Sequence, residues 1–353
     1  MAAAPNEYEH YVDLVCEGGG VKGIGLAGAY AALEKHGYKP QNVAGASAGA
    51  ITAALIAAGY TSAELDKIIF GLDYRQFEDK TWQDHIPLIG APLSILFNQG
   101  VYKGEAFLDW IRPLLAAKGV HTFGDLHTGD DDPRYRSKLQ VIVSDISARR
   151  LLVLPRDAGV LGVDPDELDV ALAVRMSMSI PIFFEAVKHQ NEKTNHEHVL
   201  VDGGMLSNFP VWLFDSEEHV VPDWPTFGLL LVEPDPKTPI TERLPEPERG
   251  PHGFKGLVAL LSSMVHTMLE AHDRLYLEKA QFARTISIPT LGVGTTEFDL
   301  TEERARELYE SGRKATEKFL ETWNFEAYIA QYRSGKPYSR RAAIGKELQA
   351  TGV

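Results

Sequence analysis

The sequence predicts an α/β fold with a mostly parallel central sheet, because short apolar segments typical of buried strands alternate with helical segments. The first unit is an apolar segment at residues 11–16, a glycine-rich turn and a helical pattern over residues 24–36. A second unit follows at once, with a short strand at 42–44 and an alanine- and isoleucine-rich helix over 50–58. A repeat of strand, turn and helix is the pattern that builds parallel sheets.

More strands and two long helices are predicted downstream. The strands fall at residues 139–145, 151–154, 199–201 and 226–232. The last of them reads TFGLLLV, an uninterrupted apolar run typical of a strand buried on both faces. An amphipathic helix is expected over residues 254–280, and a second begins near Asp299, where Asp299 and Glu302 match a capping box. The second helix has apolar residues at helical spacing, so it is expected to cover the sheet; these are Ala305, Leu308, Ala315, Phe319 and Trp323.

We expect one domain. Its core spans residues 12–215, residues 216–332 supply a further strand and covering helices of the same domain, and residues 333–353 form a polar tail. The proline-rich stretch at 234–251 is expected to be a surface loop, because no low-complexity linker accompanies it.

Composition excludes several classes of function. The chain has 353 residues, 44% of them hydrophobic, and a net charge of −14 with Lys and Arg scattered along it. No basic patch is therefore available for nucleic acid or for electrostatic docking on anionic membranes. One cysteine, Cys16, excludes an internal disulfide and a four-thiolate zinc site, which fits a cytoplasmic protein. No signal peptide or membrane span is expected, so any contact with a membrane or micelle surface would be apolar and transient.

The strongest chemical signal is Gly45-Ala46-Ser47-Ala48-Gly49, which matches the G-x-S-x-G nucleophile elbow. In such an elbow a sharp strand-to-helix turn exposes the serine, and small residues on both sides let the strand and helix approach each other. The helix that follows would place its positive dipole end and the N–H of Ala48 where an oxyanion forms. A tight turn with an incidental serine gives the same motif, so context has to decide.

A glycine-rich turn, GGGVKG at residues 18–23, lies one strand earlier and fits the dinucleotide pattern G-x-G-x-x-G. A dinucleotide site would need an acidic residue about 20 positions further on, where this chain has Ser47 instead. A Walker loop would need Ser or Thr after Lys22, which is followed by glycine. The turn is better interpreted as a row of backbone N–H donors for an oxyanion or a lipid phosphate, with Lys22 adding charge.

Asp202 is the best candidate for the base that a serine nucleophile requires. It stands in Val201-Asp202-Gly203-Gly204, at the end of an apolar strand, where it could share the carboxyl edge of the sheet with Ser47. An ordinary Asp-Gly turn is the simple alternative. Three motifs together favour the catalytic interpretation.

In this order and spacing, GGGVKG, GASAG and VDGG make the sequence resemble the patatin-like phospholipase family. The resemblance covers residues 12–211, with weaker similarity over 295–300. It extends to Ser144-Asp145, to residues 174–181 ahead of Phe183, and to Asn208 and Pro210.

The resemblance implies a three-layer α/β/α fold of the bacterial patatin-like type and hydrolysis of glycerolipid acyl esters without a metal or cofactor. It makes Ser47 the nucleophile and Asp202 its partner in a Ser-Asp dyad. The oxyanion hole would be formed by Gly18, Gly19 and Gly20, together with the Ala48 N–H. Burial would have to raise the pKa of Asp202 for the carboxylate to act as a base.

Three further residues stand near these motifs. Lys22 stands where family members have Lys or Arg, and Arg175 matches a recurrent family arginine. We expect Arg175 to support the site as scaffold or charge, and a purely structural role is equally consistent. Glu17 departs from the Ser or Asp of many relatives, which affects the loop rather than the dyad.

Alternatives remain at the level of mechanism. A Ser-Asp-His triad would take its histidine after Asp202, where His219, His252, His266 and His272 are available. Another trio, His189, His196 and His198, lacks helical metal-ligand spacing and is expected to lie in a solvated turn. Asp130–Asp132 lacks the spaced ligands of a calcium loop and is expected to be a surface turn.

Alternatives also remain at the level of function. The apolar segment at 86–115 would form either a lid and acyl-chain pocket or a buried helix pair. The expected function is a phospholipase A or lysophospholipase acting on phospholipid or another acyl lipid. A general carboxylesterase, a thioesterase or a catalytically silent lipid-binding protein are the alternatives, and intact Ser47 and Asp202 argue against the last. Sequence gives no indication of oligomeric state.

Overall fold

The computed structural model describes residues 10–72, 100–215, 221–232, 264, 268, 279–295, 297 and 299–333. Within them the main sheet has eight strands, seven of which follow the spatial order β10-β9-β1-β2-β4-β8-β7, with β5 paired to β4. Their bounds are β1 (Tyr11–Cys16), β2 (Lys39–Gly45), β4 (Leu139–Asp145), β5 (Arg150–Leu154), β7 (Val187–Asn191), β8 (His196–Asp202), β9 (Thr226–Val232) and β10 (Thr285–Pro289). A separate parallel pair joins β3 (Gly100–Tyr102) to β6 (Ile182–Phe184).

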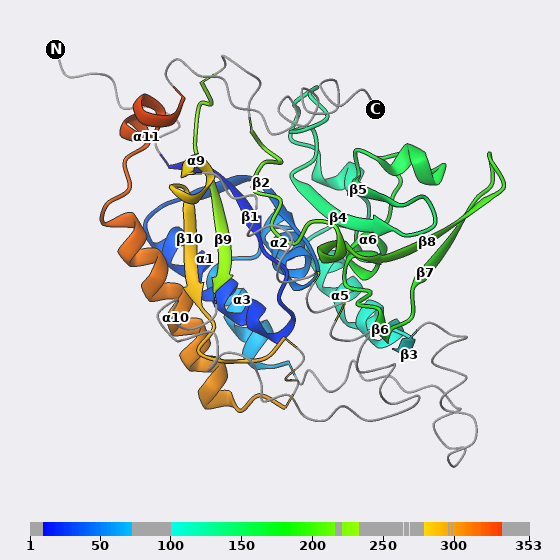
Figure 1. The fold of residues 1–353 in the computed structure, drawn as a ribbon, viewed down its shortest axis with the longest axis horizontal. Helices are drawn as coiled ribbons and strands as arrows, with labels where there is room; N and C mark the ends of the chain where they lie inside the picture. The colour runs from blue at the N-terminus through cyan, green and yellow to red at the C-terminus, as the bar shows by residue number, and fades with distance from the viewer. Residues whose placement is uncertain are drawn as a thin grey trace.

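Five adjacent strands, from β10 to β4, are parallel to one another, which confirms the α/β class and the mostly parallel sheet. The far end of the sheet is antiparallel, since β8 pairs antiparallel with both β4 and β7, and β5 pairs antiparallel with β4. Figure 1 shows the two halves side by side, with β9 and β10 at one end and the long β7–β8 hairpin at the other.

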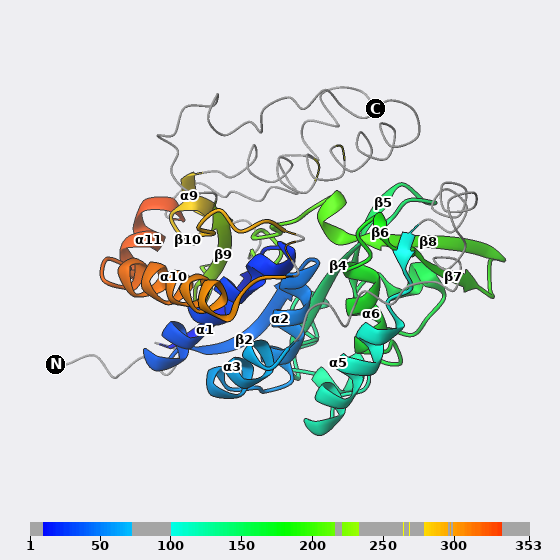
Figure 2. The same ribbon diagram turned by 90° about the horizontal axis from the view of Figure 1, so that it is seen from below.

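Most of the described helices pack on one face of the sheet, where α1, α2, α3, α5 and α6 share a core cluster with the strands (Figure 2). Their bounds are α1 (Ile24–Lys35), α2 (Ala48–Ala57), α3 (Ser62–Phe70), α5 (Glu105–Ala117), α6 (Val170–Ser177), α9 (Lys279–Phe282), α10 (Glu302–Leu320) and α11 (Phe325–Tyr332). Short 3₁₀ turns include η1 (Gly20–Gly23) and η6 (Gly203–Met205). Among the described residues, no helix is both long enough and apolar enough to cross a bilayer.

Successive side chains of a strand point to opposite faces of the sheet, so the core has two layers. Leu14 and Val43 face a large cluster shared with the helices, whereas their neighbours Val15 and Ala44 face a second cluster. This period of two is expected for strands covered on both faces. In the described part of the chain, the second face is covered by the segment at 209–214.

The structure corrects two local predictions. Helix α10 begins at Glu302 and its N-cap is Thr301, whose side chain accepts from the Arg304 N–H, so the cap is not Asp299. Ala305 and Leu308 are buried on this helix as predicted. The segment predicted as a solvated histidine turn is instead the β7–β8 hairpin, in which His189 pairs with His198. Strand β8 also pairs with β4, and His198 is buried there beside Asp145.

Three other predictions concern residues that the structure does not describe. They concern most of the helix at 254–280, of which Met264 and Met268 are seen as helical, the loop at 234–251 and nearly all of the tail.

Candidate active site

Ser47 occupies a strained turn between the end of β2 and the start of α2. Its φ of 51° and ψ of −128° place a non-glycine residue in a region that costs roughly 1–3 kcal/mol. The turn is possible because the residues two positions before and after Ser47 are glycines. A Cβ on Gly45 would lie 2.3 Å from the backbone of Gly49, and one on Gly49 would lie 2.3 Å from the carbonyl oxygen of Cys16. Ser47 is only 4% exposed.

Asp202 reaches the same place from an antiparallel strand. Gly45 of β2 pairs with Val141, so the second half of β4 projects beyond the end of β2. Strand β8 pairs with this projecting half, and its last residue, Asp202, stops opposite Val143. Asp202 therefore lies level with the nucleophile turn, although its strand arrives from the direction opposite to the one expected for a parallel sheet.

The Asp202 carboxyl is completely buried, and burial raises its pKa from 3.8 to about 7. Hydrogen bonding by the Ser47 side chain and by the Gly204 N–H, which donates to Oδ1 at 2.8 Å, lowers the pKa but offsets only part of this rise. Oδ2 makes no hydrogen bond of ordinary geometry within the described residues. It is therefore open to accept the Ser47 proton.

The glycine-rich turn lies against the segment that follows Asp202. The Gly18 N–H donates to the Asn208 carbonyl at 3.1 Å, and Asn208 Nδ2 donates back to the Gly18 carbonyl at 2.9 Å. Gly18 thus fixes the turn, and its N–H is already engaged. The structure shows no hydrogen bond from the N–H groups of Gly19, Gly20 and Ala48 to other described residues.

A cavity of about 90 Å³ opens beside Ser47. Ser47, Gly20 and Ala48 lie in its wall, so the serine and the N–H groups border one space. The rest of its lining is mainly apolar and includes Ile51, Leu55, Leu65, Ile68, Phe107 and Trp110. Phe107 and Trp110 belong to the apolar segment at 86–115, most of whose first half lies outside the described residues.

Comparison with known proteins gives a direct answer on family. The profile of a family described as "Patatin-like phospholipase" matches residues 14–215, more than half of the chain. The chain belongs to this family. It is 39% identical over 316 residues to the "Uncharacterized protein YqhO" of Bacillus subtilis strain 168, covering 89% of this chain and 100% of that protein. It is also 23% identical over 212 residues to the "Uncharacterized protein R571" of Acanthamoeba polyphaga mimivirus, covering 58% of this chain and 62% of that protein.

Among solved structures, VipD from Legionella pneumophila has a similar fold. The TM-score is 0.53 at 19% sequence identity, over 89% of this chain and 67% of VipD. This similarity agrees with the three-layer α/β/α class. Membership of the patatin-like phospholipase family places the protein among hydrolases of lipid acyl esters.

Arg175, which the sequence predicts to support the site, makes hydrogen bonds to one side chain and two backbone carbonyls. Arg175 is buried, and its guanidinium donates to Ser179 Oγ, to the Lys103 carbonyl at 2.5 Å and to the Glu185 carbonyl at 2.9 Å. These contacts make Arg175 a brace between α6 and its neighbouring segments. None of these contacts is to Ser47 or Asp202.

Two more charged residues hold the glycine turn. Glu17 Oε2 accepts from the Leu231 N–H at 2.5 Å, and the Glu17 N–H donates to the Leu229 carbonyl at 3.1 Å, which ties the turn to β9. Lys22 is 5% exposed, and its N–H donates to the Gly19 carbonyl at 3.1 Å. Its buried stem packs against Gly19 rather than extending into solvent.

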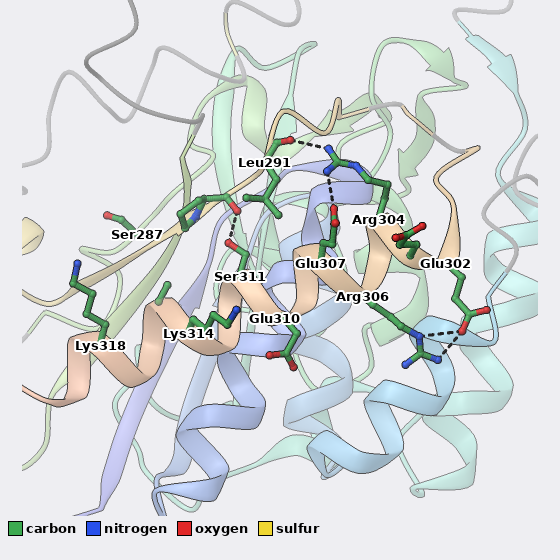
Figure 3. Close-up of a pocket in the computed structure, with 13 residues that line it drawn as sticks. Ser287, Leu291, Glu302, Arg304, Arg306, Glu307, Glu310, Ser311, Lys314 and Lys318 are labelled. Carbon is green, nitrogen blue, oxygen red and sulfur yellow. Dashed lines mark hydrogen bonds and ion pairs between the residues drawn. The ribbon is translucent and has the colours of Figure 1, made fainter.

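A second hollow, of about 1390 Å³, lies between α10 and the edge formed by β10 and the residues just after it (Figure 3). Four of its charged side chains form two ion pairs, Arg306 with Glu302 at 2.6 Å and Arg304 with Glu307 at 2.7 Å. None of the patatin-like motif residues lines it. We therefore place the site at the smaller cavity.

The histidines have varied surroundings. His198 is buried and its Nδ1 lies 2.6 Å from Asp145 Oδ2, whereas His189 contacts the Leu161 carbonyl at 3.0 Å. No group of three or more His, Cys, Asp or Glu side chains suited to a metal ion is found in the described ranges. The four histidines of the triad alternative, His219, His252, His266 and His272, all lie outside the described residues.

Sequence reasoning missed the contribution of Ser177. Its Oγ accepts from the Ser47 N–H at 2.9 Å and donates to the Ile142 carbonyl at 2.6 Å. The sequence signal for this residue is its place in the segment at 174–181, which is part of the resemblance to the family.

Proposed function

We propose that the protein is a metal-independent phospholipase A or lysophospholipase that hydrolyses glycerolipid esters through a Ser47-Asp202 dyad. The observation that carries this proposal is the buried carboxyl beside a strained serine, with a pKa near 7. A carboxylate with this pKa is a far better base at neutral pH than an ordinary aspartate.

The chemistry proceeds in two halves. Asp202 takes the proton of Ser47 as Oγ attacks the ester carbonyl, and the N–H groups of Gly19, Gly20 and Ala48 bind the oxyanion. The intermediate collapses as the leaving alcohol takes the proton back from Asp202, and an acyl-enzyme remains on Ser47. Asp202 then deprotonates water, which attacks the acyl carbonyl. Collapse of the second intermediate returns the proton to Ser47 and releases the fatty acid.

The apolar cavity beside Ser47 would hold the start of the acyl chain, because burial of methylene groups there is favourable by about 0.8 kcal/mol each. Gly18 acts in this scheme by fixing the turn through Asn208, while Arg175 and Lys22 support the scaffold. The active protein would contact membranes or micelles through its substrate.

Release of fatty acid from mixed phospholipid micelles in EDTA tests the proposal. Wild-type protein should release acyl chains, and Ser47→Ala and Asp202→Asn should each reduce the rate by at least about a thousandfold. Activity that EDTA abolishes, or that survives in Ser47→Ala, would contradict it.

The small size of the cavity favours a second candidate, a carboxylesterase or thioesterase for short acyl groups. Binding sites for drug-sized ligands usually measure about 300–1,000 Å³. Rates on p-nitrophenyl butyrate and short acyl thioesters that exceed those on phospholipid would favour this candidate, with the same dyad.

A further inference from the structure

We propose that Ser177 is a positioning residue for the nucleophile, and that the turn ending α6 sets the geometry of Ser47 relative to Asp202. This inference rests on the proposed function of the two residues. It concerns what holds them in place rather than the reaction itself.

The Ser177 hydroxyl links the nucleophile turn to the central sheet. Its Oγ accepts the N–H of Ser47 at 2.9 Å and donates to the Ile142 carbonyl of β4 at 2.6 Å. Ser177 has no exposed surface, so water cannot replace either bond. Only a group that donates and accepts at once can satisfy both backbone partners, which is why a hydroxyl is required here.

The same turn also holds the base. Two residues after Ser177, the Ser179 carbonyl accepts the N–H of Asp202 at 2.9 Å. One short turn of chain therefore binds the backbone N–H of both members of the dyad. A shift of this turn would move Ser47 and Asp202 relative to each other.

Arg175 fixes the turn from behind. It donates to Ser179 Oγ, and Ser179 Oγ in turn donates to the Arg175 carbonyl at 2.8 Å. Its other contacts are the carbonyls of Lys103 and Glu185, so the turn is anchored to segments on both sides of it. The contacts form a continuous chain from Arg175 through the turn to Ser47 and Asp202.

Backbone strain explains why the nucleophile needs such a hold. Ser47 has a φ of 51°, and a strained conformation persists only where surrounding contacts determine it. On its carbonyl side, Ser47 is held by the helix that follows, since its carbonyl accepts from the Ala50 N–H. On its N–H side, it is held by the bond to Ser177. This bond also occupies that N–H, which leaves Ala48 rather than Ser47 to bind the oxyanion.

Ser177→Ala tests the proposal, with Thr316→Val as the matched control. Thr316 is also fully buried, and its hydroxyl donates to the Gly312 carbonyl at 3.0 Å within α10. Helix α10 does not line the cavity beside Ser47. Both variants lose one buried hydroxyl. The rate of Ser47 labelling by a fluorophosphonate, kcat and KM on an ester, and thermal unfolding are measured for each.

We expect Ser177→Ala to lower the labelling rate and kcat by about a hundredfold with KM nearly unchanged, because the nucleophile is misplaced by a fraction of an ångström or more. Thr316→Val should label at the wild-type rate despite a comparable loss of thermal stability. Ser177→Thr, which restores the hydroxyl, should recover part of the rate. Labelling of Ser177→Ala at the wild-type rate would overturn the proposal.

If Ser177→Ala does not fold, Ser177→Cys takes its place. A thiol is a weak donor and a weak acceptor, so Ser177→Cys should also lower the labelling rate and kcat, by a smaller factor than Ser177→Ala. A wild-type labelling rate would again overturn the proposal. Failure of the proposed function is distinguishable, because wild-type protein would then show no labelling that depends on Ser47.

Discussion

Replacement of Asp202 by asparagine should abolish turnover and at the same time stabilise the folded protein at alkaline pH. Burial raises the pKa of Asp202 from 3.8 to about 7, so the folded state favours the protonated carboxyl. The stability that the folded state gains from the protonated Asp202 carboxyl is fully present below pH 3.8 and is lost as pH rises toward 7. Above pH 7 the folded protein contains a buried carboxylate, and asparagine removes this cost.

The size of the effect follows from the pKa shift. At 1.36 kcal/mol per unit, a shift of about three units corresponds to about 4 kcal/mol as an upper value. Between pH 5 and pH 8, the stability advantage of Asp202→Asn over wild type should grow by roughly 2–3 kcal/mol. The Gly204 N–H can still donate to an asparagine Oδ1, so the substitution leaves that hydrogen bond intact.

Equilibrium urea unfolding at pH 5 and pH 8 measures this difference, with Ser47→Ala as the control. Both variants are inactive, but Ser47→Ala keeps the carboxyl and should keep the loss of stability with rising pH. The loss should be slightly larger, because hydrogen bonding from Ser47 lowers the pKa of Asp202. If Asp202→Asn is no more stable than wild type at pH 8, the carboxyl is not the buried, proton-binding group described above.

The remaining predictions concern the pH dependence of activity, the nucleophile turn at Ser47 and the glycine-rich turn at Gly18. The value of kcat/KM on an ester should rise with pH to a plateau, with its midpoint near pH 7 where Asp202 ionises; a midpoint near pH 4 in a pH–rate profile would contradict this assignment. Gly49→Ala should lower the thermal midpoint far more than Gly159→Ala, because its Cβ would lie 2.3 Å from the carbonyl oxygen that ends β1, whereas Gly159 has open space. Asn208→Ala should lower kcat roughly tenfold or more, because the glycine turn loses the bond to the Gly18 carbonyl; unchanged steady-state kinetics would show that this bond does not position the turn.

The alternation of strands and helices was predictable because it depends on local patterns. The apolar run of β1 and the glycine just after α1 are visible in the printed sequence, and both elements lie where expected. The nucleophile turn was predictable for a similar reason, since only small residues at positions 45 and 49 permit the close approach seen there. Family membership, indicated by three motifs, is confirmed.

The direction of β8 could not be predicted from local pattern. An apolar strand followed by Asp-Gly-Gly looks the same in a parallel or an antiparallel pair, and only the register with β4 places Asp202 beside Ser47. Likewise, the engagement of the Gly18 N–H depends on Asn208, which is 190 residues away in the chain. Contacts of this range are set by tertiary packing and leave no period in the sequence.

Ser177 illustrates the same limit. A serine near the end of a short helix has no distinctive pattern, and its partners, Ser47 and Ile142, come from two other elements. The N-cap of α10 was mistaken for a related reason, because Asp299 and Thr301 both precede acidic residues and only the geometry selects Thr301.

The central claim, that a fatty acyl group is transferred to Ser47, is tested most directly by trapping the intermediate. Wild-type protein turning over a phospholipid is quenched in acid, digested and examined by mass spectrometry for an acylated peptide. The account predicts one fatty acyl group on the peptide that contains Ser47, and none in Ser47→Ala. Steady release of fatty acid with no acyl group on that peptide, or with one on another residue, would contradict it.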